Sequence, residues 1–324
     1  MVKSAMVKEY HVHILKYRGS ITETESLGTK KKFWLSFEKH PTLHTLKRQL
    51  FKFKKEGTGE DWAEKIVCEI CSLLGLPHAQ YELARIDDDD GCFDGTLSKD
   101  FGLSGYEQRL GNQLLWECDP HYPKDTSKAH VREHTIGNIR TALEEVGVVS
   151  SWLAELPKGI VTAQDVFVGY LMLDAWVANQ DRHHENWAAL QNSRTGKSIL
   201  APTFDHGASL AHTLNDDVRR RRLETKDRGH ISNFVEKAKS EIFATETSSK
   251  RLSTIETFDA FAEKLPDAAK IWLEKLSSIS MKDVHPIIDK IPKKIMSETS
   301  KEFTAELLTL NQRRLLKLQE KYNG

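Results

Sequence analysis

The segment NQDRHHENWAAL, residues 179–190, crowds six charged or polar side chains, Asp181 to Asn186, behind an apolar run. That run, LMLDAWVA at residues 171–178, predicts the end of a buried helix. Charged groups at the edge of a core are unfavourable unless another group pairs with them. The segment therefore indicates either mutual pairing or a ligand site, with a metal ion or a phosphate as the ligand.

The spacing of the polar residues is typical of phosphoryl transfer. Asp181 and Asn186 are separated by four residues, and Asp205 follows in APTFDHGASL, residues 201–210. Such chemistry needs one carboxylate to accept the proton of the attacking hydroxyl, and further oxygens to ligate Mg²⁺. D-x4-N followed by D-x-G supplies them in the order of a kinase catalytic loop and metal loop. Short runs at 186–190 and 198–202 predict a hairpin that returns Asp205 beside Asn186.

The same residues allow two other interpretations. The helix end could simply be capped by Asn179 or Asp181, with the histidines in solvent. Alternatively, Asp181, Asp205 and the histidines 183, 184 and 206 could form a transition-metal site. Adjacent histidines usually diverge, and the H-x-H or H-x3-H spacing of such sites is absent from this stretch. A kinase interpretation becomes strong only if the amino-terminal part supplies a lysine and a glutamate.

A strand and a helix near residue 50 supply this pair. In QLFKFK, residues 49–54, strand alternation puts Lys52 and Lys54 on one face. The amphipathic helix predicted from residue 60 carries Glu64 and Glu69. At 100° per residue, Glu64 falls inside the apolar arc and Glu69 opposite it. A carboxylate on a buried face needs a cation, so we expect Glu64 to pair with Lys52, with Lys54 as the alternative.

The loop ESLGTKKKFW, residues 25–34, is the candidate phosphate loop. Gly28 would let the backbone approach a phosphate closely, and the lysines at 30, 31 and 32 would add positive charge. This loop would sit over the phosphates of a nucleotide, and any of the three lysines could make the contact. A basic hairpin turn without a ligand is the competing interpretation.

The distribution of predicted elements favours two lobes. Residues 1–98 contain strand patterns at 9–18, 33–37, 49–54, 78–86 and 91–98 with one helix, whereas residues 99–324 are dominated by helical patterns. The helical patterns are at 136–156, 161–178, 230–245, 255–278 and 299–321. We therefore predict an α+β fold with a small β-rich lobe, 1–98, and a larger helical lobe, 99–324, that could hold a nucleotide between them.

Composition excludes several classes of function. Lys+Arg and Asp+Glu both number 47 in the 324 residues, so the chain has no net charge that would indicate direct DNA binding. No apolar run is long enough to span a bilayer, and the first residues have no signal-peptide pattern. We expect no membrane insertion and a cytoplasmic location, with secretion as an effector also compatible.

Cys68 and Cys71 fall inside the amphipathic helix and are expected in the core rather than at zinc.

Taken together, DRHHENW, APTFDHG, FKF before AEKIVCEICSLLGLP, and GTKKKFW resemble the HipA-like serine/threonine kinases. The resemblance runs from about Gly28 to the last helices and is greatest to short, stand-alone members without the extra amino-terminal subdomain of full-length HipA toxins. It implies a bilobal protein-kinase-like fold. One departure is the loop, where the family commonly has Gln before its lysine and this chain has GTKKK.

Carried over position by position, the resemblance implies a role for each motif residue. Asp181 would be the catalytic base, and Asn186 and Asp205 the Mg²⁺ ligands. Lys52 would bind the ATP phosphates and Glu64 would hold Lys52. The segment from Gly28 to Lys32 would be the phosphate loop, in which Gly28, Thr29 and Lys32 would bind the nucleotide.

The activity implied is an ATP- and Mg²⁺-dependent protein kinase that transfers the γ-phosphate to Ser or Thr. The resemblance also implies autophosphorylation, which we expect at Ser26 or Thr24, and a role as a toxin or effector, with a possible antitoxin partner. Because DRH also occurs in phosphatidylinositol kinases, a lipid or small-molecule kinase is the alternative. A pseudokinase is disfavoured because all five motif residues are present.

The arginine-rich segment DDVRRRRLETKDR, residues 216–228, occupies the position of an activation segment. Acidic residues flank the arginines on both sides, which favours a solvated, charge-balanced loop. Alternatively, Arg219 to Arg222 could hold an acidic substrate or an RNA.

Overall fold

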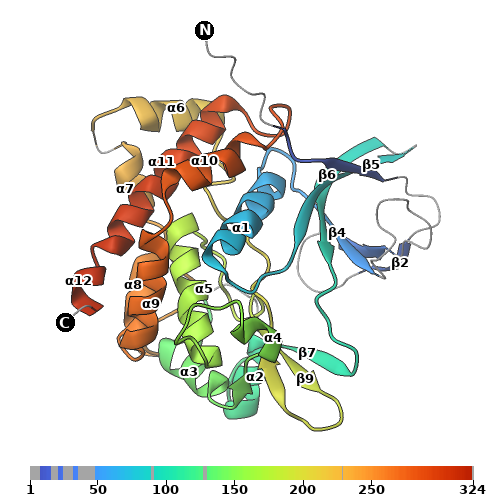
Figure 1. Ribbon diagram of the computed structural model, residues 1–324, viewed down its shortest axis with the longest axis vertical. Helices are drawn as coiled ribbons and strands as arrows, with labels where there is room; N and C mark the ends of the chain where they lie inside the picture. The colour runs from blue at the N-terminus through green and yellow to red at the C-terminus, as the bar shows by residue number, and fades with distance from the viewer. Residues whose placement is uncertain are drawn as a thin grey trace.

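The computed structural model describes residues 8–15, 21–24, 32–35, 48–88, 91–126, 130–227 and 229–322. A curved sheet lies on one side and a group of helices on the other, with helix α1 (Glu60–Leu74) between them (Figure 1). The fold is therefore α+β, as predicted. Within the described ranges, no helix combines the length and apolar character needed to cross a bilayer.

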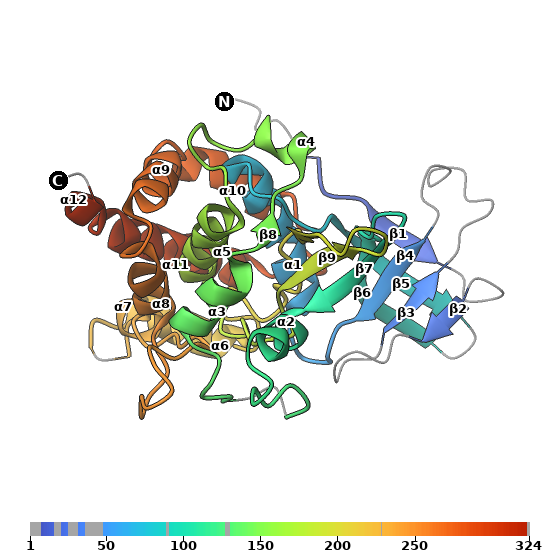
Figure 2. The same cartoon turned by 90° about the horizontal axis from the view of Figure 1, so that it is seen from below.

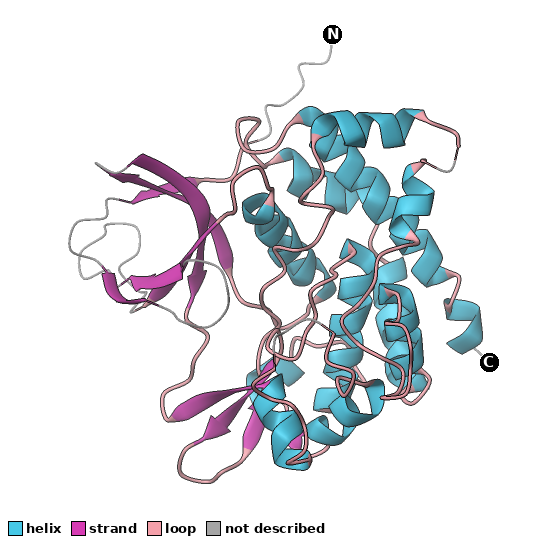
Figure 3. Cartoon of the chain, turned by 180° about the vertical axis from the view of Figure 1, so that it is seen from behind, coloured by secondary structure: helices cyan, strands magenta, loops and turns pink. Residues whose placement is uncertain are grey.

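The amino-terminal sheet has six strands in the order β1-β5-β6-β4-β3-β2. All neighbours are antiparallel except β1 and β5, which are parallel. Strand β2 was not predicted, because its segment is polar. Figure 3 shows the strands as one curved layer. Their bounds are β1 Val12–Leu15, β2 Ile21–Thr24, β3 Lys32–Leu35, β4 Gln49–Phe53, β5 Tyr81–Asp88 and β6 Gly91–Lys99.

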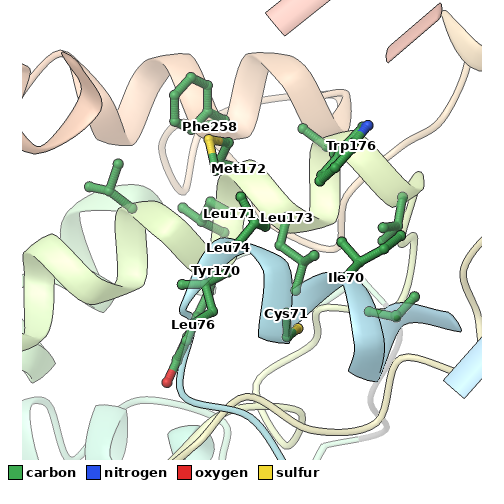
Figure 4. Close-up of a cluster of buried hydrophobic side chains, with 14 of the residues drawn as sticks. Ile70, Cys71, Leu74, Leu76, Tyr170, Leu171, Met172, Leu173, Trp176 and Phe258 are labelled. Carbon is green, nitrogen blue, oxygen red and sulfur yellow. The ribbon is translucent and has the colours of Figure 1, made fainter. Parts of the chain in front are cut away.

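Helix α1 begins and ends where the sequence predicts. Glu60 and Asp61 occupy its first turn, where the helix dipole favours negative charge. It ends at Gly75, which adopts the left-handed conformation with φ 71° that glycine allows without strain. Helix α1 contacts β5 and β6, yet its apolar face belongs to the same core as the central helix α5 (Ala163–Val177). In Figure 4, Ile70, Cys71 and Leu74 lie beside residues of α5.

The helical part is built around α5, most of whose residues are buried. It begins at a capping box formed by Thr162 and Asp165, and α8, α9 and α11 pack against it (Figure 2). The remaining helices are α2 Gly111–Cys118, α3 Ile136–Leu143, α4 Ser150–Leu153, α6 Asp216–Glu224, α7 Ile231–Val235, α8 Thr254–Ala262, α9 Pro266–Ser277, α10 Met281–Asp289, α11 Glu298–Leu316 and α12 Gln319–Tyr322.

Several helix predictions were wrong because tertiary pairing or proline ends the helical pattern. Predicted helix 136–156 divides into α3, the strand β8 (Val146–Gly147) and α4. Predicted helix 230–245 stops at Val235, since the chain then hydrogen-bonds to residues 252 and 136. Predicted helix 255–278 is two helices, because Pro266 begins α9 rather than extending α8. Helices α2 and α10 were not predicted.

The arginine-rich segment is also different from its prediction, because residues 216–224 form helix α6 rather than a loop. Arg219 is buried at 5% exposure and donates hydrogen bonds to Ser300 Oγ at 2.8 Å and to the Ala211 carbonyl oxygen at 3.2 Å. Arg220 and Arg221 are exposed. Arg219 therefore anchors α6 to α11 and is not available to a substrate.

A second sheet carries the hairpin of the motif. Its order is β7-β9-β10-β8, with β7 Tyr106–Leu110, β9 Ala188–Asn192 and β10 Ser198–Leu200. Strands β9 and β10 are antiparallel with Leu200 opposite Ala189, which is the predicted hairpin. The division at residue 98 stays a proposal, since β6 runs to Lys99 and α1 shares its core with the helical part.

Candidate active site

Strand β4 and helix α1 bring Lys52 and Glu64 together. Lys52 Nζ donates a hydrogen bond to Glu64 Oε1 at 2.8 Å, and the two residues are only 7% and 1% exposed. Lys54, the alternative partner, instead lies 3.3 Å from Asp61 Oδ2 and 3.6 Å from Asp94 Oδ2. The ion pair expected from strand and helix geometry is thus present, while its catalytic role stays a prediction.

The other glutamate of α1 has a different partner. Glu69 Oε1 lies 2.7 Å from Lys65 Nζ, and the Glu69 side chain is 31% exposed. Helical periodicity places Lys65 beside Glu69 and opposite the apolar arc, yet Lys65 is buried and its Nζ lies 4.7 Å from the centre of the Tyr10 ring. Helical periodicity separated the two glutamates but could not show that residues before β1 would cover Lys65.

Asp205 joins the pair from the segment after β10. Lys52 Nζ also donates to Asp205 Oδ1, and the backbone N–H of His206 donates to Glu64 Oε2 at 2.8 Å. A Cβ on Gly207 would lie 3.3 Å from Glu64 Oε1. Glycine at this third position of D-x-G therefore allows the loop to approach Glu64 closely.

The charge of Lys52 is stabilised by both carboxylates. Burial by itself would lower the pKa of Lys52, but Asp205 and Glu64 outweigh it and hold the pKa well above the ordinary value for lysine. Lys52 is consequently a fixed positive charge, and a fixed positive charge is suited to binding phosphate oxygens.

The loop after α5 presents Asp181. Ala178 takes a left-handed conformation with φ 53°, which ends the helix sharply. Asn179 then donates from Nδ2 to Asp174 Oδ1 at 2.8 Å and accepts from the backbone N–H of Asp181 at 3.2 Å. The Asp181 side chain is 41% exposed. Asp181 is therefore a solvent-exposed carboxylate on a loop fixed by hydrogen bonds, and an incoming hydroxyl group could reach it.

Asn186 and Asp205 flank the same end of the hairpin. The backbone N–H of Ala201 donates to the Ala188 carbonyl at 3.0 Å, so the segments that carry the two residues leave the hairpin side by side. Asn186 Nδ2 donates to the Asp181 carbonyl oxygen at 2.7 Å. Because that bond uses the amide nitrogen, the amide oxygen is the atom left for a cation.

The residues present fit magnesium. A carboxylate from Asp205 and an amide oxygen from Asn186 are the hard oxygen donors that Mg²⁺ prefers, and phosphates commonly supply further ligands. In the part of the chain that the structure describes, no group of three or more His, Cys, Asp or Glu side chains is arranged to hold a metal ion.

Arg182, His183 and His184 are buried at 1%, 5% and 1% exposure, so the interpretation that leaves the histidines in solvent is wrong. Tyr122 Oη and His184 Nδ1 lie 2.8 Å apart. No local pattern could have linked Tyr122 to a residue so distant in the sequence.

A buried histidine from another segment braces the start of β9. Trp187 Nε1 donates to His134 Nε2 at 3.2 Å, and His134 Nδ1 lies 3.1 Å from the Glu241 carbonyl oxygen. His134 therefore accepts with one ring nitrogen and donates with the other, as only a neutral imidazole does. Burial, helped by the neighbouring His184, lowers the pKa of His134 to about 3.

The phosphate-loop prediction lies largely outside the described residues. This applies to Gly28 and Thr29 and to the lysines 30 and 31. Lys32 begins β3 directly opposite Lys52 of β4. Because opposed residues of antiparallel strands project from the same face, Lys32 and Lys52 share one side of the sheet.

Comparison with known proteins supports the kinase resemblance. A 146-residue part of the chain, 44% of it, is 30% identical to the serine/threonine-protein kinase CtkA of Helicobacter pylori. The match spans only 41% of that relative. No protein-family model matches the chain.

Two solved structures show the fold. The crystal structure of CtkA, described as a proinflammatory kinase, superimposes with a TM-score of 0.70 at 20% identity over 95% of this chain and 98% of CtkA. HipA of a Shewanella oneidensis toxin–antitoxin system, solved with HipB and operator DNA, gives 0.53 at 12% identity over 90% of this chain and 64% of HipA. The resemblance inferred from the motifs is confirmed, and the chain has the bilobal, HipA-like kinase fold.

Proposed function

We propose that this protein is an ATP- and Mg²⁺-dependent kinase that transfers the γ-phosphate to a Ser or Thr hydroxyl of a protein substrate. The observation that carries the proposal is Lys52, buried and bonded to both Glu64 and Asp205. Sequence similarity to CtkA, a serine/threonine-protein kinase, supports a protein acceptor.

Each residue has one task in this proposal. Lys52 binds the ATP phosphates, and Glu64 fixes the position of its ammonium group. Asp181 accepts the proton of the attacking hydroxyl, which general bases do with rate effects of about 10²- to 10⁴-fold. Asn186 and Asp205 hold Mg²⁺, which neutralises phosphate charge when bound.

The test is incubation of the pure protein with radiolabelled ATP, alone and with a cell lysate. We expect label on protein that falls by at least about 100-fold in Asp181→Asn, the lower end of the range for losing a general base. Nucleotide binding should persist in this variant, because Asp181 contacts the acceptor rather than the phosphates. Label that appears only in lipid or small molecules would favour the alternative acceptor, and equal labelling by Asp181→Asn would contradict the assignment.

Autophosphorylation is part of the proposal. Thr24 ends β2, and Ser26 lies outside the described residues. Mass spectrometry after incubation with Mg-ATP should find phosphate on the peptide that contains both, and an unmodified peptide would contradict this. A toxin or effector role, an antitoxin partner and a cytoplasmic location also stay proposals, the first two from the likeness to HipA.

A further inference from the structure

Arg182 is a buried arginine that contacts three separate segments. Its Nε and Nη2 donate to the two carboxylate oxygens of Asp174 on α5 at 2.7 and 2.8 Å. Its Nη1 donates to the backbone carbonyl of Asn186 at 2.5 Å, and its Nη2 donates to Thr203 Oγ1 at 3.0 Å. The fork geometry of a guanidinium allows this, whereas a lysine could not reach all three.

Thr203 follows strand β10, and its hydroxyl oxygen accepts the hydrogen bond from Arg182. Its hydroxyl oxygen lies 2.8 Å from His206 Nε2, and because the hydroxyl accepts from Arg182, its own proton can be donated to that nitrogen. The Thr203 backbone donates to the Pro77 carbonyl at 3.0 Å and accepts from the Ala79 N–H at 2.9 Å. Thr203 is therefore fixed to the connection between α1 and β5.

The two contacts of Arg182 bear directly on the two magnesium ligands of the proposed function. One contact is to the backbone of Asn186 itself, and the other is to Thr203, two residues before Asp205. His206, which Thr203 contacts, donates its backbone N–H to Glu64. Through these contacts, Arg182 connects the loop that carries Asn186 with the segment that carries Asp205, and that segment in turn contacts Glu64.

We propose that Arg182 and Thr203 form a clamp that positions Asn186 and Asp205 for Mg²⁺. Neither residue touches the nucleotide in this proposal, and both act through the spacing of the two ligands. The inference rests on the proposed function, since it concerns magnesium bound with ATP. It predicts that loss of the Thr203 hydroxyl weakens metal binding more than it weakens the fold.

The experiment compares three threonine variants. Thr203→Val keeps the shape and removes the hydroxyl, whereas Thr203→Ser keeps the hydroxyl and removes the methyl. Thr304→Val is the matched control, because Thr304 is a fully buried threonine of α11 whose Oγ1 has no hydrogen-bond partner in the described part of the chain. Should Thr203→Val not fold, Thr203→Cys replaces it, since a thiol is a weak hydrogen-bonding group.

The readout is thermal protection by a nonhydrolysable ATP analogue, measured across a Mg²⁺ titration and again without Mg²⁺. We expect Thr203→Val to need about tenfold more Mg²⁺ for half-maximal protection, the scale of one lost hydrogen bond to a charged group. Thr203→Ser should restore most of the wild-type dependence, and Thr304→Val should match the wild type.

Three results would overturn the inference. Wild-type magnesium dependence in Thr203→Val would show that the hydroxyl does not position the ligands. An equal shift in Thr203→Ser, or in Thr304→Val, would show that the effect comes from general loss of packing. If the wild type itself lacked magnesium-dependent protection, the proposed function would fail and the clamp with it, which is distinguishable from failure of the clamp alone.

Discussion

Replacing Glu64 by glutamine tests the ion pair with the smallest change of shape. Glu64 Oε1 accepts from Lys52 at 2.8 Å and Oε2 accepts from the His206 N–H at 2.8 Å, in a side chain that is almost fully buried. Glutamine has one oxygen, so its NH₂ group must face either the ammonium or the N–H, donor against donor. Losing one hydrogen bond to a charged group costs about 1.5–3 kcal/mol.

That free energy corresponds to a fall of about 10- to 150-fold in kcat/KM for ATP, if Lys52 acts on the phosphates in the transition state. Lys52 keeps its contact with Asp205, so the fold should survive the substitution. The assay is initial-rate phosphorylation over a range of ATP concentrations, with the melting temperature measured in parallel.

Glu69→Gln is the control on the same helix. Glu69 pairs with Lys65 and is partly exposed, so this variant should change kcat/KM by less than twofold and stability by only about 0.5 kcal/mol. The reasoning would be refuted if Glu64→Gln retained wild-type kcat/KM, or if both variants lost activity equally.

Three further predictions follow from the contacts. Lys52→Met should lower activity by at least about 100-fold because the proposed phosphate-binding cation is lost and buried Glu64 loses its partner, whereas Lys54→Met should stay within a few-fold in the same labelling assay. Burial lowers the pKa of His134 from the ordinary 6.5 to about 3 in the folded protein. The stability that the neutral imidazole contributes is therefore complete above pH 6.5 and decreases as the pH falls towards 3. The free energy of unfolding, measured with urea at pH 7 and pH 5, should fall by about 1.4 kcal/mol for each pH unit below 6.5. The difference between the two pH values should be smaller in His134→Gln. Arg219→Met should destabilise by about 1–3 kcal/mol because its buried partners lose their donors, while exposed Arg220→Met should shift stability by less than about 0.5 kcal/mol.

The ion pair could be predicted because two local rules were enough. Strand alternation placed Lys52 on a face, and the 100° step of a helix placed Glu64 inside an apolar arc. A buried carboxylate then needs a cation, and the nearest lysines in sequence were candidates. The structure distinguishes Lys52 from Lys54 through Asp61 and Asp94, which hold Lys54 elsewhere.

The clamp could not be predicted in this way. Arg182 has partners in three separate segments, and no periodicity in the sequence connects Thr203 to it. Helix α6 is a different case, because its sequence contains residues that are typical of the two ends of a helix. Asn215 accepts from the Val218 N–H at 2.9 Å, two aspartates follow it, and arginines occupy the last turn. These features suit the helix dipole, but the low apolar content of the segment favoured a loop.

The packing of α1 bears on how the site is assembled. Ile70 and Leu74 share one core with Trp176 of α5, the helix that leads directly into the Asp181 loop (Figure 4). Glu64 is therefore fixed relative to that loop by the helical part, while Lys52 is carried by the sheet. The Lys52–Glu64 contact joins these two units, so a rotation of the sheet away from the helices would stretch this bond together with the packing of α1 on β5 and β6. Because Asp205 holds the same ammonium group, the segment that carries Asp205 would separate from Lys52 in the same movement.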